Sequence, residues 1–89
     1  MSDITIYSKE NCPYCRMAKE LLTARKLTFN EIKIDTDEAK YEEMIQLSHR
    51  RTVPQIFIKG QHIGGYDDLV GLVKSGKLDT LLKTEKDTL

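Results

Sequence analysis

The chain has 89 residues, which is enough for one domain with a modest core and too few for two. Fourteen basic residues balance fourteen acidic ones, so the net charge gives no reason to expect binding to nucleic acid or to a membrane surface. The start of the chain lacks the features of a secretory signal, and no apolar run approaches the ~20 residues of a membrane helix. We therefore expect one cytoplasmic domain over residues 1–89.

The first half of the chain predicts two strands that alternate with two helices. β-Branched residues indicate a strand over 4–7, and a polar loop leads from it into a helix over 13–26. Apolar residues recur along this helix at the spacing of one buried stripe: Tyr14, Met17, Ala18, Leu21 and Leu22. A second strand is expected over 28–34. The acidic segment 35–38 then suits the start of a helix that buries Tyr41, Met44, Ile45 and Ser48.

The second half predicts a hairpin followed by two more helices. A strand over 53–58 turns at Gly60-Gln61 into a short strand over 62–64. A third helix, capped by Asp67 or Asp68, carries the apolar residues Leu69, Leu72 and Val73 and ends at Gly76. Leu78, Leu81 and Leu82 indicate a final short helix, and residues 84–89 are expected to form a flexible tail.

This order of elements predicts an α/β fold. A helical crossover between the first two strands implies that they are parallel, whereas the hairpin adds antiparallel strands. The expected product is a four-stranded mixed sheet with helices on both faces. The first helix then begins at the carboxyl end of the first strand, where open α/β sheets usually place their sites.

Two cysteines, Cys12 and Cys15, stand at the expected start of the first helix. A helix start offers unpaired N–H groups and a partial positive charge, both of which favour a thiolate. In a reducing cytosol a Cys-x-x-Cys pair is catalytic or metal-binding more often than structural. A bridge that spans two residues would also stabilise the chain little. The spacing therefore indicates a redox-active pair.

Three separated motifs, taken together, resemble a dithiol glutaredoxin of the thioredoxin-fold superfamily, of the bacterial Cys-Pro-Tyr-Cys type. They are Cys12-Pro13-Tyr14-Cys15, Thr52-Val53-Pro54 and Gly64-Gly65-Tyr66-Asp67-Asp68. The resemblance covers 4–82. It implies a thioredoxin-like fold and a glutathione-dependent thiol–disulfide oxidoreductase that reduces protein disulfides and glutathione mixed disulfides in cell redox homeostasis.

We expect Cys12 to be the nucleophile, because its sulfur meets the N–H groups of the first helical turn and Lys9 adds positive potential. Cys15 lies deeper in the helix and is expected to be the resolving thiol. Pro13 stiffens the turn. Tyr14 either offers a ring beside the sulfur or belongs to the buried stripe of the helix.

The other two motifs are expected to bind glutathione. The resemblance implies that Pro54 is cis, faces the cysteines, and leaves the backbone of Val53 to pair with the cysteine residue of glutathione. The loop of Gly65, Tyr66 and Asp67 resembles the site for the γ-glutamyl end, although the family more often has Cys or Ser at position 66. The glutathione-binding residues expected from sequence are Lys9, Tyr14, Arg51, Thr52, Val53, Pro54, Gly65, Tyr66 and Asp67.

Lys9 and either Arg50 or Arg51 could flank the glycyl carboxylate, and Arg51 matches the family better because it directly precedes Thr52. We expect no metal site and no tightly bound cofactor, with glutathione as co-substrate. The expected protein partners contain disulfides or are glutathionylated. We expect the protein itself to be a monomer.

Other functions remain open at this point. A metal or iron–sulfur carrier could use both cysteines with His49 and His62, but these histidines lie far from the cysteines in the sequence and are expected on the surface. Some glutaredoxins bridge a [2Fe–2S] cluster, an arrangement that proline between the cysteines disfavours. A thioredoxin-type protein fits less well, since no tryptophan precedes Cys12. A purely structural domain would not need an intact Cys-x-x-Cys.

Overall fold

The computed structural model describes residues 3–87, with 84–87 described by their backbone alone. Its elements, in chain order, are β1 (Ile4–Ser8), α1 (Pro13–Ala24), β2 (Asn30–Lys33), α2 (Glu38–Ser48), β3 (Gln55–Ile58), β4 (Gln61–Gly64), α3 (Tyr66–Ser75) and α4 (Lys77–Asp87). The strands form one sheet in the order β2-β1-β3-β4. The β1–β2 pair is parallel, while β1–β3 and β3–β4 are antiparallel. The predicted four-stranded mixed sheet is therefore confirmed.

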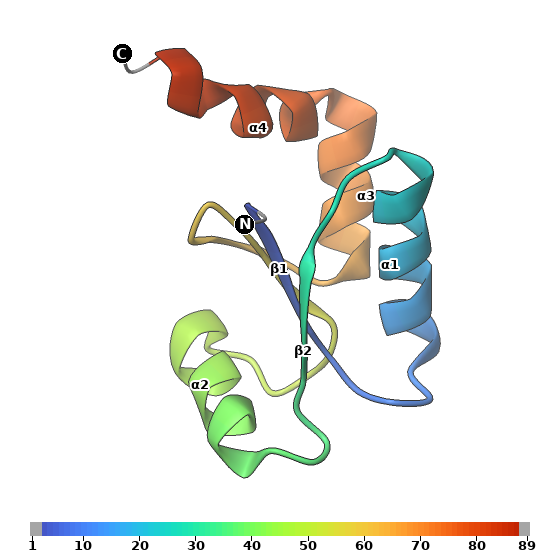
Figure 1. Cartoon of the computed structure of the whole chain (residues 1–89), viewed down its shortest axis with the longest axis vertical. Coiled ribbons are helices and arrows are strands. Elements are labelled where there is room, and N and C mark those ends of the chain that lie inside the picture. Colours follow the sequence, from blue (N-terminus) through green and yellow to red (C-terminus); the bar gives the residue numbers. More distant parts are fainter. Residues whose placement is uncertain (1–2, 88–89) are drawn as a thin grey trace.

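Helices cover both faces of the sheet (Figure 1), as predicted: α1 and α3 pack on one face, α2 lies on the other, and α4 crosses one end. Side chains that alternate along the strands supply both layers. The larger core cluster joins the sheet to α1, α3 and α4 and consists of Ile4, Ile6, Ala18, Leu22, Ile56, Ile58, Leu69 and Leu78. The smaller cluster lies under α2 and consists of Tyr7, Ile34, Met44 and Phe57.

Helix α1 differs from its predicted stripe at the end that carries the cysteines. Ala18 and Leu22 are fully buried, but Tyr14 is 58% exposed and Met17 is 40% exposed. The prediction that Met17 is buried was wrong, and of the two roles left open for Tyr14 the exposure excludes membership of the buried stripe. Cys15 occupies the buried position in the first turn instead. The spacing of apolar residues indicates that they share one face of the helix, but it does not indicate which part of that face other elements cover. In α1 the part that carries Tyr14 and Met17 is exposed to solvent.

Helix α2 follows its prediction closely. The Asp37 side chain accepts a hydrogen bond from the backbone N–H of Lys40 at 3.1 Å, which caps the first turn. Met44 and Ser48 are buried, as expected, while Tyr41 and Ile45 are partly buried against the smaller core cluster. The helix ends at Ser48, and the C-cap residue His49 adopts a left-handed conformation.

Several boundaries differ from expectation. The hairpin turn is formed by Lys59 and Gly60, both with positive φ, rather than by Gly60 and Gln61. Strand β3 begins at Gln55, because Pro54 has no N–H to offer the sheet. Helix α4 continues to Asp87, past the expected start of the tail, and residues 88–89 lie outside the described part of the chain.

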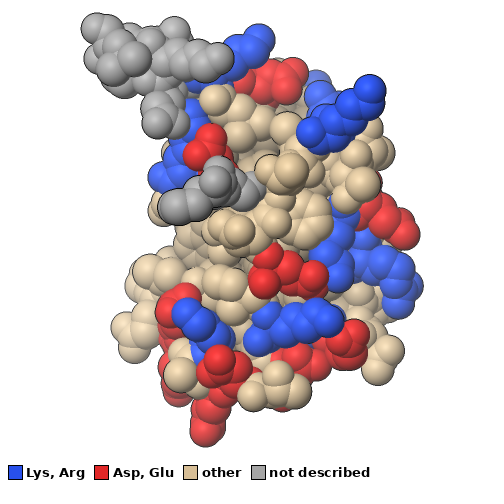
Figure 2. All heavy atoms as spheres, in the orientation of Figure 1, with Lys and Arg blue, Asp and Glu red and all other residues tan. Residues whose placement is uncertain are grey.

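Charged side chains of both signs are interspersed on the face shown in Figure 2, in keeping with the zero net charge of the chain. Among the helices of residues 3–87, none is long and apolar enough to cross a bilayer. Electrostatic steering of a small anion therefore depends on local arrangements of side chains rather than on an overall field.

Candidate active site

Cys12 is the N-cap residue of α1. Asn11, in the left-handed region, turns the chain into Cys12, and Pro13 occupies the start of the helix. The Sγ atom of Cys12 accepts a hydrogen bond from the backbone N–H of Cys15 at 3.2 Å. This sulfur is partly exposed and faces the first turn of the helix, where N–H groups and the helix dipole favour negative charge. The N-cap position expected from the sequence is confirmed.

Cys15 lies in a very different environment. Only 1% of its surface is exposed, and its thiol is free. Burial raises the pKa of the Cys15 thiol to about 12, and its hydrogen bond with Cys12 adds to the rise. At neutral pH Cys15 is therefore protonated and inaccessible to bulky reagents. The two thiols lie one helical turn apart but differ in their access to solvent.

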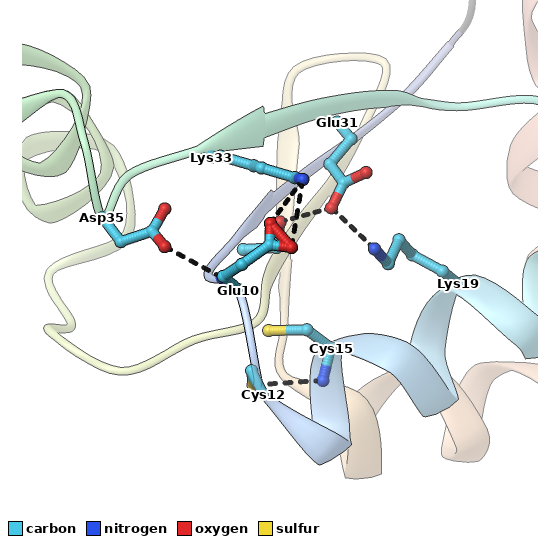
Figure 3. A network of polar contacts seen from close by, with 8 residues as sticks. Glu10, Cys12, Cys15, Lys19, Glu31, Lys33 and Asp35 are labelled. Atoms are coloured by element: carbon cyan, nitrogen blue, oxygen red, sulfur yellow. Dashed lines mark hydrogen bonds and ion pairs between the residues drawn. The ribbon is translucent and has the colours of Figure 1, made fainter.

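A polar cavity of about 170 Å³, named here the cysteine cavity, reaches both thiols. Around it Figure 3 shows a network that links the loop before Cys12 to α1 and β2. Lys19 Nζ lies 2.8 Å from Glu31 Oε2, which also accepts a hydrogen bond from the hydroxyl of buried Ser8 at 2.6 Å. Lys33 Nζ lies 2.8 Å from Glu10 Oε1. Ion pairs thus hold charged side chains beside the sulfur atoms.

Partial burial works to raise the pKa of Glu31, but the hydrogen bonds from Lys19 and Ser8 outweigh it and lower that pKa below its usual range. Glu31 therefore remains ionised at neutral pH. None of this network was predicted, because its pairs join residues far apart in the sequence. One local signal existed: Lys19 follows Cys15 by four residues and so shares its face of α1.

A second cavity of about 310 Å³, named here the Pro54 groove, lies between the loop before β3 and the start of α3. It is lined by Tyr14, Arg50, Thr52, Val53, Pro54, Gln55, Gly65, Tyr66, Asp67 and Asp68. The structure thus brings together most of the residues expected to bind glutathione. The Val53–Pro54 peptide bond is cis, as the resemblance implied.

The floor of this groove depends on two residues that the sequence reasoning missed. Gln55 is buried, and its Nε2 donates to the carbonyl of Thr52 at 3.0 Å. Its Oε1 lies 2.7 Å from Nε2 of His62, so the amide orientation identifies this ring nitrogen as the donor. His62 was expected on the surface but is half-buried. A glutamine opening an otherwise apolar buried strand was the available signal.

Burial lowers the pKa of His62 below its ordinary value of 6.5, and the nearby charge of Arg50 lowers it further. A neutral His62 can donate through Nε2 to Gln55 and carry no charge into the groove. The relay from His62 through Gln55 to Thr52 therefore holds the loop before β3 in place at neutral pH.

The opposite wall of the groove is the start of α3. The Asp68 carboxylate accepts a hydrogen bond from the backbone N–H of Gly65 at 2.9 Å, so Asp68, rather than Asp67, caps this helix. Gly64 has φ +126°, a conformation that L side chains rarely adopt. The rings of Tyr14 and Tyr66 stand 6.0 Å apart across the mouth of the groove.

Two of the residues expected to bind glutathione lie outside the lining of the Pro54 groove. Lys9 lines the cysteine cavity instead, and Arg51 is exposed. Arg50 lines the groove, where its guanidinium lies 3.5 Å from Asp68 Oδ2. Of the two arginines considered from sequence, Arg50 lines the groove and Arg51 does not.

Within residues 3–87, no group of three or more histidine, cysteine or acidic side chains is arranged to hold a metal ion. A larger hollow of about 530 Å³ at the start of α2 reaches Lys9 but neither thiol. Both cysteines line the cysteine cavity, and the Pro54 groove borders Tyr14, the residue before Cys15.

A cysteine N-cap, a buried partner thiol and a cis-proline loop on this sheet define a thiol–disulfide oxidoreductase with a thioredoxin-like fold. The glutaredoxin family model matches residues 4–63. Glutaredoxin 3 of Escherichia coli (strain K12) is 57% identical over 83 residues, covering 93% of this chain and 100% of that protein. A glutaredoxin of Neisseria meningitidis is 47% identical over 83 residues, covering 92% of this chain and 98% of its own.

Solved structures agree. The buckwheat glutaredoxin–glutathione complex superposes with a TM-score of 0.84 at 31% identity, covering 93% of this chain and 78% of that one. The glutaredoxin of Brucella melitensis superposes with a TM-score of 0.81 at 48% identity, covering 96% of this chain and 92% of that one. The chain belongs to the glutaredoxin family and is a glutathione-dependent thiol–disulfide oxidoreductase.

Proposed function

We propose that Cys12 is the nucleophile and Cys15 the resolving thiol in the reduction of glutathionylated and disulfide-containing proteins. The contrast between the two sulfurs carries this assignment. Cys12 is partly exposed at a helix N-terminus, whereas Cys15 is buried and protonated at neutral pH. Only a thiolate attacks a disulfide efficiently, so the first attack falls to Cys12.

Two routes follow from this assignment. With a glutathionylated protein, the Cys12 thiolate attacks the glutathione sulfur, the protein leaves as a thiolate that takes up a proton, and a second glutathione thiolate releases glutathione disulfide. With a protein disulfide, Cys12 forms a mixed disulfide with the protein. Cys15 then loses its proton and attacks Cys12 Sγ, which closes the Cys12–Cys15 disulfide and frees the reduced protein. Two glutathione molecules restore both thiols.

The Pro54 groove is the proposed binding site for glutathione. The buckwheat relative is a glutathione complex with the same fold, and the groove here opens beside Tyr14 in the first turn of α1. The backbone of Val53 would pair with the cysteine residue of glutathione in the manner of an added strand. Thr52, Pro54 and Tyr66 would shape the contact.

The two charged ends of glutathione call for different partners. Backbone N–H groups in the first turn of α3, other than that of Gly65, which donates to Asp68, would hold the γ-glutamyl carboxylate. Asp67, which is exposed beside the Asp68 cap, would hold the ammonium. Lys9 with Arg50 or Arg51 would flank the glycyl carboxylate, and the groove geometry favours Arg50.

We further propose a cytoplasmic monomer with a single domain over 1–89, glutathione as its co-substrate and no tightly bound cofactor. In support, one chain supplies both the cysteine cavity and the Pro54 groove. The proposed protein partners are those that carry disulfides or bound glutathione, with neither nucleic acid nor membrane among the partners.

The assignment is tested by reduction of the mixed disulfide of glutathione and 2-mercaptoethanol, coupled to glutathione reductase. Cys12→Ser is expected to abolish turnover, since no other thiolate can start the reaction. Cys15→Ser is expected to retain it, because the first route needs only Cys12. Loss of turnover in Cys15→Ser together with retention in Cys12→Ser would reverse the two roles.

A further inference from the structure

The buried thiol presents a chemical difficulty for the second route. Cys15 must lose its proton before it can attack Cys12, yet burial and the neighbouring sulfur both oppose that loss. Some group must favour the Cys15 thiolate when it is needed, and the proton must have a way out. The inference below rests on the proposed role of Cys15 as the resolving thiol.

The cysteine cavity offers both charged groups that favour the thiolate and a route for the proton. At about 170 Å³ it has room for several water molecules, and its polar lining gives them hydrogen-bond partners. Water in this cavity can carry the proton of Cys15 to solvent. The charged side chains that line it are Lys9, Glu10, Arg16, Lys19 and Lys33. Cations thus outnumber carboxylates around a thiol that must become negative.

Among these cations, Lys19 is the one best placed to act on Cys15. It follows Cys15 by four residues, so both side chains lie on the same face of α1, and helical side chains lean toward the N-terminus. Its charge works against the rise in the Cys15 pKa, as does a backbone hydrogen bond from Lys9. Lys33 lies on β2 rather than on the face of α1 that carries Cys15, and it pairs with Glu10 in the loop before Cys12. Lys9 and Arg16 are exposed.

The ammonium of Lys19 is also held in position. Glu31 Oε2 lies 2.8 Å from Lys19 Nζ and accepts a hydrogen bond from Ser8 Oγ, which is fully buried in β1. Three elements therefore fix one cation, and Figure 3 shows Lys19 of α1 reaching Glu31 of β2. A lysine that is already held in place loses less conformational entropy when it stabilises a thiolate than a free lysine, whose side chain must first be ordered.

We propose that Lys19, anchored by Glu31 and Ser8, promotes the resolving step by stabilising the Cys15 thiolate. In this step the Cys15 proton passes to water in the cysteine cavity. The new thiolate attacks Cys12 Sγ, the bond between Cys12 and the substrate sulfur breaks, and the substrate leaves as a thiolate that is then protonated. The two cysteines are oxidised, the substrate is reduced, and glutathione later reduces the pair. Lys19 is a supporting residue that acts through Cys15.

The test follows single turnover after the reduced protein is mixed with excess glutathione disulfide, with acid quenching and mass spectrometry. The first phase forms the glutathione adduct on Cys12, and the second converts it to the Cys12–Cys15 disulfide. Lys19→Met should reduce the ratio of second-phase to first-phase rate about three- to fourfold. One lost charge reduces the thiolate fraction about tenfold, and the greater nucleophilicity of a more basic thiolate partly compensates.

Two further variants separate this role from a structural one. Lys19→Arg keeps the charge and should retain the wild-type ratio. Lys74→Met removes an exposed lysine in the last turn of α3 and should leave both phases unchanged. In Lys19→Met the rise of the second-phase rate with pH should also move to higher pH.

An unchanged ratio in Lys19→Met, an unshifted pH profile, or an equally slow second phase in Lys19→Arg would overturn the inference. Absence of the first phase in the wild-type protein would instead overturn the proposed function. The two failures are therefore distinguishable in one experiment.

Discussion

The two cavities beside the cysteines are built in different ways. The cysteine cavity is surrounded by charged side chains whose positions depend on ion pairs such as Lys19–Glu31. In the Pro54 groove, hydrogen bonds hold the backbone of the lining residues in place: Gln55 donates to the carbonyl of Thr52, and Asp68 accepts from the N–H of Gly65. On the proposals above, the first region controls the charge on sulfur and the second fixes the shape of the glutathione site.

This difference indicates which substitutions each region should tolerate. Removal of a charge from the cysteine cavity should alter rates and pH profiles while the fold remains stable, because both ion pairs there are at least partly exposed to solvent. A change in the backbone supports of the groove should instead lower stability and weaken binding together. The following predictions test the groove side of this comparison.

The largest effect is expected for Gly64→Ala. A Cβ atom at Gly64 would overlap the Asp68 carboxylate, and the backbone at φ +126° would be strained. Strain and the lost cap together should lower the free energy of unfolding by about 2–4 kcal/mol. The Michaelis constant for glutathione should rise as well. Urea unfolding and steady-state kinetics measure the two effects.

Gly71→Ala is the matched control for this substitution. Gly71 lies in the middle of α3, and a Cβ atom there would meet nothing within 4 Å. Alanine should leave stability unchanged or raise it by about 0.5–1 kcal/mol. Equal stability of the two variants would contradict the special role of Gly64.

A smaller effect is expected for Asp68→Ala. It removes the cap on Gly65 and the pair with Arg50, and should cost about 1 kcal/mol of stability. Asp67→Ala changes the neighbouring residue, which does not supply the cap, and should weaken glutathione binding with little change in stability. Thermal melts and glutathione kinetics of both variants provide the comparison. A stability loss in Asp67→Ala as large as in Asp68→Ala would contradict the division of roles.

The smallest effect is expected from the titration of His62. Its folded-state pKa lies below the ordinary 6.5, so the unfolded chain binds a proton first as the pH falls. The free energy of unfolding should therefore decrease as the pH drops below about 6.5, and the contribution should be complete below the folded pKa. Between pH 7.5 and 5, the wild-type protein should lose more stability than His62→Gln. Equal losses of stability in the two proteins would show that His62 does not contribute to the pH dependence.

Much of this site was predictable because its main parts are local in sequence. The N-cap position of Cys12 follows from a strand, a polar loop and Pro13 in succession, and the cis form of Pro54 followed from the resemblance alone. The exposure of Tyr14 and Met17 was not predictable, since periodicity does not reveal which part of an apolar face the sheet leaves uncovered. Two further features depend on tertiary contacts: the Ser8–Glu31–Lys19 network and the His62–Gln55 pair.

The central claim is that one helical turn separates a reactive thiol from a protected one, and alkylation tests it most directly. The reduced protein would be treated with a small excess of iodoacetamide at neutral pH, and the labelled cysteine identified by peptide mass spectrometry. The structure predicts rapid labelling of Cys12, with Cys15 left unmodified until the protein is unfolded. Labelling of Cys15 at the same rate as Cys12, or before it, in the folded protein would contradict the claim.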